Sequence, residues 1–161
     1  MENGKIVKLI AAILICEFVG LLGSVFTISS ITTWYAALHK PSFSPPNWLF
    51  GPVWTLLYAL MGISVYLIWE KGIKKKGVKP ALKIFSLQLI LNFIWTILFF
   101  GLRSPLLGLI AIAVLWIAIL ATILKFAKLS KNAAIIMVPY ILWVSFAAIL
   151  NLAVWMLNSI I

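Results

Sequence analysis

The chain has 161 residues, of which 65% are hydrophobic and only 10% charged, and its mean hydropathy is +1.18. A soluble domain carries about a quarter charged residues, so this composition excludes a water-soluble globular protein. The net charge of +10 does not indicate nucleic-acid binding, because the basic residues lie in short connections where they set topology and contact lipid headgroups. The composition predicts an integral membrane protein whose partner is lipid rather than nucleic acid.

Side chains for metal binding and ordinary catalysis are scarce. The sequence contains one histidine, one cysteine (Cys16) and no aspartate. One His and one Cys do not make an ordinary protein metal site, and a Ser-His-Asp arrangement is impossible. A single cysteine also excludes an intramolecular disulfide. We therefore expect no metal and no intrinsic cofactor.

Five apolar segments predict an all-α membrane protein, a bundle of five transmembrane helices, because each segment is long enough to cross a bilayer. The first is too long for a cleaved signal peptide and is not followed by an A-x-A-like site. No linker and no repeat interrupts the sequence, so residues 1–161 are expected to form a single domain. The segments cover about 6–28, 50–70, 81–101, 105–126 and 133–158.

The first segment carries Glu17 near its middle. An ionisable side chain at membrane depth is a functional hypothesis by default. The alternative is a protonated acid that forms a hydrogen bond with a neighbouring helix or a second subunit, and the sequence leaves both open. Gly20, Gly23 and Ser24 make a patch of small residues that permits close helix packing.

The connection at 29–49 is rich in aromatic residues and proline. Residues 34–54, WYAALHKPSFSPPNWLFGPVW, include three tryptophans, four prolines and His39. The prolines are expected to exclude ordinary helix from 42–48, whereas Pro52 suits the first turn of the second span. The aromatic residues have two interpretations. They form a stiff lid with one wall of a ligand site, or Trp34, Tyr35 and Trp48 belong to the interfacial belt.

Three later spans carry polar and aromatic residues at helical spacing. Amides in hydrocarbon are costly unless they find partners inside the bundle. One such stripe is more often packing than a site, but three of them beside an aromatic loop favour a cavity. The stripes are Trp54, Tyr58 and Met61; Gln88, Asn92, Trp95 and Phe99; and Trp143, Ala147 and Asn151, with Asn158 two turns beyond.

The basic residues predict the orientation. Eleven of the thirteen lie at the N-terminus or in the connections after the second and fourth spans, and only Lys40 and Arg103 lie on the other side. This bias predicts a cytoplasmic N-terminus and an outside C-terminus.

Several of these segments resemble the translocator protein family, also called tryptophan-rich sensory proteins or peripheral benzodiazepine receptors. WYAALHKPSFSPPNWLFGPVWTLLY (34–58) resembles the family's first loop and second helix. QLILNFIWTILFF (88–100) resembles its third helix, PYILWVSFAAILNLAVWMLN (139–158) its fifth, and FVGLLGSVFT (18–27) more loosely its first. The resemblance runs over nearly the whole chain.

The resemblance implies a five-helix bundle, often a homodimer, with a pocket open toward the first loop. Family members bind porphyrins such as protoporphyrin IX, related tetrapyrroles, and isoquinoline carboxamide or benzodiazepine drugs. In this sequence Trp54 and Trp143 would face the macrocycle and are the candidate catalytic residues of a light- and oxygen-dependent porphyrin degradation reported for bacterial members. The ligand-binding residues carried over from the family are Tyr35, His39, Trp54, Asn92, Trp95, Trp143 and Ala147.

One segment departs from the animal members, which have a cholesterol-recognition stretch with Tyr and Arg at the end of the fifth helix. Here that segment reads ILNLAVWMLNS and has neither residue, which argues against sterol binding. The basic inner loop and the lack of a transit peptide favour a multi-pass protein of the bacterial cell membrane.

Together these features predict a membrane sensor or scavenger that binds a tetrapyrrole. Asn92 would offer the ring a hydrogen bond, and His39 and Lys40 would meet its propionates at the mouth. A first alternative is an enzyme that breaks the porphyrin down. Its chemistry would come from the bound porphyrin, since the sequence has no paired carboxylates and no activated Ser or Cys. A second alternative is a transporter, against which the small size and the lack of paired discontinuous helices argue.

Overall fold

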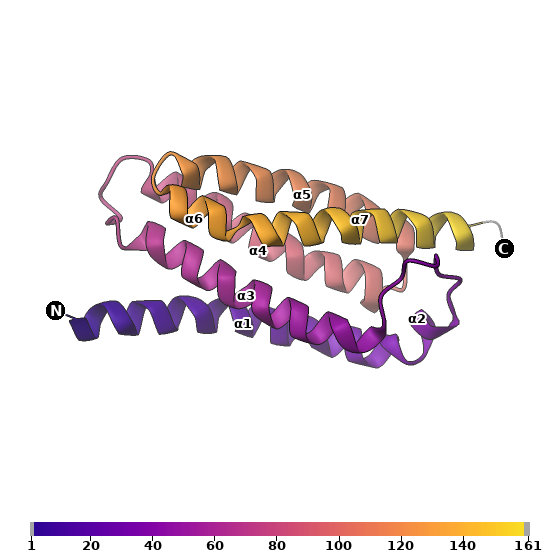
Figure 1. Ribbon diagram of the computed structural model, residues 1–161. Helices are drawn as coiled ribbons and strands as arrows, with labels where there is room; N and C mark the ends of the chain where they lie inside the picture. Colours follow the sequence, from indigo (N-terminus) through magenta and orange to yellow (C-terminus); the bar gives the residue numbers. More distant parts are fainter. Residues whose placement is uncertain (1, 160–161) are drawn as a thin grey trace.

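The computed structural model describes residues 2–159, and within that range every regular element is a helix (Figure 1). Figure 1 shows the long helices side by side in one bundle, with the two termini at opposite ends. This confirms the predicted all-α class and the five spans. The helical segments that are long and apolar enough to cross a membrane are Asn3–Ile31, Asn47–Trp69, Val78–Gly101, Pro105–Ala127 and Lys131–Asn158.

Some spans consist of more than one element. The third continues from an α-helix into the π-helical turn η1, and the fifth begins with the short helix α6. A further short helix, α2, lies in the first connection. The helices are α1 (Glu2–Ile31), α2 (Trp34–Ala37), α3 (Asn47–Trp69), α4 (Val78–Thr96), α5 (Pro105–Ala127), α6 (Lys131–Ile136) and α7 (Val138–Asn158), with η1 at Ile97–Gly101.

The expected exclusion of helix from 42–48 is wrong for its last two residues, because α3 begins at Asn47. Pro46 precedes this helix as its N-cap with φ −63° and ψ 145°. A proline at this place does not interrupt the helix, since the first backbone N–H groups of a helix have no partner within it. Other helices also extend two to four residues beyond the predicted spans, because their polar ends fall outside an apolar window.

Close packing of α1 on α3 joins the first two spans. A Cβ on Gly62 would lie 2.5 Å from the backbone Cα of Ile13, so the two helices approach too closely for any larger side chain there. The other face of α1 is apolar and exposed, as at Leu14 and Phe18. A bilayer would cover that face with lipid.

The half of the bundle remote from the first connection is filled with side chains. Phe85 of α4 stacks on Phe126 of α5 with 5.8 Å between the ring centroids. Ile68, Leu115 and Ile119 are fully buried in the same core. Open space is therefore left to the other half, beneath the first connection.

Candidate functional site

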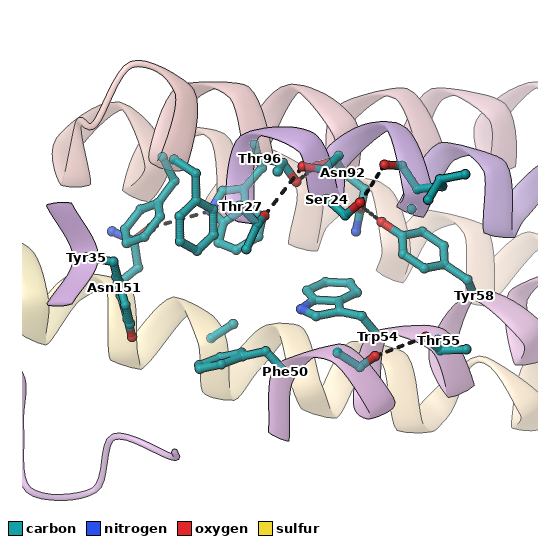
Figure 2. Close-up of a pocket in the computed structure, with 18 of the residues that line it drawn as sticks. Ser24, Thr27, Tyr35, Phe50, Trp54, Thr55, Tyr58, Asn92, Thr96 and Asn151 are labelled. Atoms are coloured by element: carbon teal, nitrogen blue, oxygen red, sulfur yellow. Dashed lines mark hydrogen bonds between the residues drawn. The ribbon is translucent and has the colours of Figure 1, made fainter. Parts of the chain in front are cut away.

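A cavity of about 320 Å³ lies between α1, α3, α4 and α7 in the half of the bundle next to the first connection. Figure 2 shows Ser24 and Thr27 of α1 on one side of it and Phe50, Trp54 and Thr55 of α3 on the other. Aromatic rings form much of its wall: Tyr35, Phe50, Trp54, Tyr58, Trp95, Phe99 and Phe100.

The wall contains five of the seven residues predicted to bind a ligand. Four separate elements contribute them: the first connection, α3, α4 and α7. The polar-aromatic stripes of the sequence therefore do converge on one space. These five residues are Tyr35, Trp54, Asn92, Trp95 and Ala147.

The other two predicted residues, His39 and Trp143, lie outside the wall. The ring of Phe50 stands on the cavity wall beside Trp143, with 6.2 Å between the centroids of their rings. The indole nitrogen of Trp143 is buried and has no hydrogen-bond partner among residues 2–159. His39 is exposed in the connection and does not line the cavity. A ligand contact for either residue stays a prediction.

Trp54 has a central position in the wall. The centroid of its indole lies 5.7 Å from the ring centroid of Tyr58 and 6.1 Å from that of Trp95, with interplanar angles of 33° and 32°. Tyr140 meets it edge-on at 6.3 Å. These contacts hold the indole in place at the cavity surface, where a flat ligand would find a rigid aromatic face.

Asn92 belongs to a buried polar network. The Tyr58 hydroxyl donates to Asn92 Oδ1 at 2.5 Å, and Asn92 Nδ2 donates to the Tyr140 hydroxyl at 3.0 Å. The side chain is 1% exposed. Each end of the amide thus already has one protein partner, and a hydrogen bond from Asn92 to a ligand stays a prediction.

Asn151 is a second amide in the wall, and it too has protein partners. Its Nδ2 donates to the carbonyl oxygen of Pro105 at 2.7 Å, and its Oδ1 accepts from the indole nitrogen of Trp95 at 3.4 Å. The polar groups of the cavity thus mainly satisfy one another. What remains for a ligand is an apolar, aromatic surface, which recognises shape more than charge.

The first connection covers the outer end of the cavity. Tyr35 is 3% exposed and packs on Phe99 and Phe100, with ring centroids 6.2 and 5.8 Å away. Burial raises the pKa of Tyr35 above its ordinary value, so its phenol stays neutral there. Residues 32–46, hereafter the lid, therefore close this end with a neutral aromatic side chain.

Two polar clamps hold the lid. Lys40 Nζ donates to the carbonyl oxygens of Tyr35, Ala36 and Leu38 at 2.8–3.2 Å, and lies 5.0 Å from the Tyr35 ring centroid. The His39 backbone N–H donates to Asn158 Oδ1 at 3.1 Å, and Asn158 Nδ2 donates to the His39 carbonyl at 2.9 Å. The ammonium of Lys40, which was expected to meet propionates, is thus committed to the lid itself.

The sequence did not identify the contribution of α1 to the wall. Gly20, Gly23, Ser24 and Thr27 line the cavity, although most of this patch had been interpreted only as a packing surface. The hydroxyl of Ser24 donates to the Leu21 carbonyl of its own helix at 2.7 Å. Spacing alone cannot distinguish small residues that pack from small residues that leave space.

Glu17 lies on the same face of α1 and lines the inner end of the cavity. Its side chain is half-buried, and it forms no hydrogen bond or ion pair with any residue of the range 2–159. The helices of the described range therefore do not supply the hydrogen bond of the second interpretation, and a partner for Glu17 in a second subunit stays a prediction.

Comparison with known proteins agrees with this architecture. Residues 12–156 match the TspO/MBR family. The tryptophan-rich protein TspO of Archaeoglobus fulgidus is 49% identical over 96% of this chain and 99% of its own length, and that of Chlorobaculum tepidum is 45% identical over 97% and 99%. The human translocator protein is 39% identical over 83% of this chain and 80% of its own. The chain, a five-helix membrane protein with an aromatic cavity, belongs to the TspO/MBR family.

Proposed function

We propose that this protein binds a flat, largely apolar ligand within the bilayer, a tetrapyrrole such as protoporphyrin IX, and acts as a sensor or scavenger of it. The observation that carries the proposal is the position of Trp54, whose indole is fixed by Tyr58 and Trp95 at the surface of the cavity. Stacking on a preformed aromatic face suits a planar ring. The two wall amides, Asn92 and Asn151, already have protein partners, and most of the remaining wall is aromatic or aliphatic, which favours an apolar ligand over a charged one.

The size of the cavity bears on which ligands fit. Its volume of about 320 Å³ is at the lower end of the roughly 300–1,000 Å³ that small-molecule pockets span. Compact ligands of the benzodiazepine or isoquinoline carboxamide kind would be enclosed. A tetrapyrrole is larger than this space, so part of its rim would remain outside the wall.

Breakdown of the bound porphyrin by light and dioxygen is the second candidate function. The position of Trp54 favours breakdown, because its oxidisable indole is on the cavity wall beside two further oxidisable rings. The ring centroids of Trp95 and Tyr58 lie 6.1 and 5.7 Å from that of Trp54. Trp143, the other tryptophan of the hypothesis, does not line the cavity and contacts the wall residue Phe50, with 6.2 Å between the ring centroids. The reaction would use the light absorption of the porphyrin itself.

The test is an equilibrium titration of protoporphyrin IX into purified protein in detergent, in the dark, followed by the porphyrin absorbance. We expect saturable binding that Trp54→Phe weakens by on the order of tenfold, which corresponds to about 1.4 kcal/mol, since a smaller ring loses part of the stacking surface. Trp48→Phe is the matched control, because Trp48 is 71% exposed and does not line the cavity. Equal affinities for both variants, or no saturable binding, would exclude the proposed role of the Trp54 face.

Illumination in air then separates the two candidate functions. One defined product that Trp54→Phe fails to form indicates breakdown of the porphyrin, and equal bleaching in all proteins indicates binding alone.

A further inference from the structure

The cavity is closed at its outer end and open at its side. At the outer end, Tyr35 is buried over Phe99 and Phe100, and Asn158 binds both the N–H and the carbonyl of His39. Passage from water would require several of these contacts to break together. The lid is therefore a poor entrance.

The walls from α4 and α7 are also closed. Every wall residue that these helices and η1 contribute is at most 9% exposed, including Trp95 at 8% and Ala147 at 9%. Behind them lies α5, whose Gly108 is buried against Phe99. No route into the cavity runs through this side of the bundle.

The remaining side, between α1 and α3, differs. Leu21 of α1 lines the cavity and is nevertheless 65% exposed, and Gly51 and Thr55 of α3 combine the same two properties. The close contact of Gly20 with the Tyr58 ring closes the inner end of this opening. Between that contact and the lid, five of the cavity-lining residues of these two helices have small side chains: Gly23, Ser24, Thr27, Gly51 and Thr55. Figure 2 shows Ser24 and Thr27 of α1 across the cavity from Trp54 and Thr55 of α3.

This opening, hereafter the window, faces the hydrocarbon of the bilayer. Its residues lie within the membrane-crossing segments Asn3–Ile31 and Asn47–Trp69. The α1 surface beside it is apolar, since Phe18 and Val25 are 58% and 64% exposed. A ligand that has dissolved in the membrane can reach the window by lateral diffusion without crossing water.

We propose that the cavity is loaded from the bilayer through the window between α1 and α3, and that its ligands are molecules already dissolved in the membrane. This inference rests on the proposed binding function and adds where the ligand comes from. It follows that exchange depends on the width of the window and not on opening of the lid. A water-soluble molecule that does not partition into lipid would not be a ligand.

The test measures exchange in proteoliposomes that already contain protoporphyrin IX, by temperature-jump relaxation of the porphyrin absorbance. Leu21→Trp/Thr55→Trp would narrow the window, and we expect the relaxation to slow by on the order of tenfold, as for a barrier raised by about 1.4 kcal/mol. The matched control is Val25→Trp/Leu56→Trp. Both of its positions are more than 60% exposed on the same helices and do not line the cavity.

A second arm locks the lid. His39→Cys/Asn158→Cys, bridged by a bifunctional thiol reagent, would replace the observed clamp with a covalent one, and Cys16 is buried away from the reagent. We expect the bridged and unbridged forms to exchange ligand at the same rate.

Loss of exchange on bridging, or equal rates in the window variant and its control, would overturn the window as the route. The amplitude of the relaxation reports whether the ligand binds at all, whereas its rate reports the route, so the two proposals can fail separately. If the wild type shows no saturable binding, the proposed function has failed, whereas binding with unaltered kinetics in all variants contradicts only the route.

Discussion

At the scale of single residues, aromatic contacts and a few buried hydrogen bonds shape the cavity. Asn92 and Trp54 were predictable because each stands in a stripe of polar and aromatic residues, a pattern that is costly in hydrocarbon unless it faces the interior. Phe50 was not predictable, since nothing in its position distinguishes a ring on the wall from one facing lipid. Trp143 was expected on the wall, but the neighbouring ring of Phe50 lines the cavity instead. Which of two adjacent rings faces a cavity depends on rotamers, and the sequence does not encode these directly.

The Tyr58–Asn92–Tyr140 network gives a prediction at this scale. Tyr58→Phe removes the donor to Asn92 Oδ1 and leaves a buried acceptor unpaired, which we expect to lower the free energy of unfolding by about 1–3 kcal/mol. Tyr66→Phe is the control on the same helix, because the Tyr66 hydroxyl forms no hydrogen bond within residues 2–159. Thermal unfolding in one detergent measures both. A Tyr58→Phe midpoint equal to that of Tyr66→Phe would show that the network does not stabilise the fold.

At the scale of helices, apolar length predicted the spans, and their ends were less predictable. Capping explains one end that the hydropathy window did not find: the Ser130 hydroxyl accepts from the Ala133 N–H at the start of α6, two residues before the predicted start of the fifth span. The helix α2 in the first connection was also missed, because a single turn has no detectable period. Nor did apolar length reveal which helices touch, a property that depends on small residues such as Gly62.

The contact of Gly62 with Ile13 yields the prediction for this scale. A methyl group on Gly62 would collide with backbone atoms that side-chain motion cannot relieve, so Gly62→Ala should destabilise the protein by about 1–3 kcal/mol. In Gly51→Ala the added methyl group meets nothing within 4 Å, which makes it the control on the same helix. If thermal unfolding places the two midpoints together, α1 and α3 do not pack as described.

At the scale of the whole molecule, the lysine-rich connections and the cavity lie at opposite ends of the bundle. The lid covers one end, whereas the ends of α3 and α5 that carry the lysine-rich connections lie at the other, where Lys8 pairs with Glu70 at 3.2 Å (Figure 1). The separation of basic residues was evident from the sequence. Their location on the cytoplasmic side stays a prediction, which thiol labelling of Lys75→Cys from either side of the membrane checks. Homodimer formation stays a prediction as well.

The central claim is that the ligand occupies the cavity beneath the lid, and filling that cavity is its most direct test. Ala147 lies on the wall and is 9% exposed, so Ala147→Phe would place a ring in the space without altering the outer surface. Ile149→Phe adds a similar ring two residues away on the lipid-facing side, where Ile149 is 59% exposed. Titration of protoporphyrin IX into both folded variants is the measurement. We predict that Ala147→Phe abolishes saturable binding and that Ile149→Phe binds like the wild type, whereas undiminished binding by Ala147→Phe would contradict the claim.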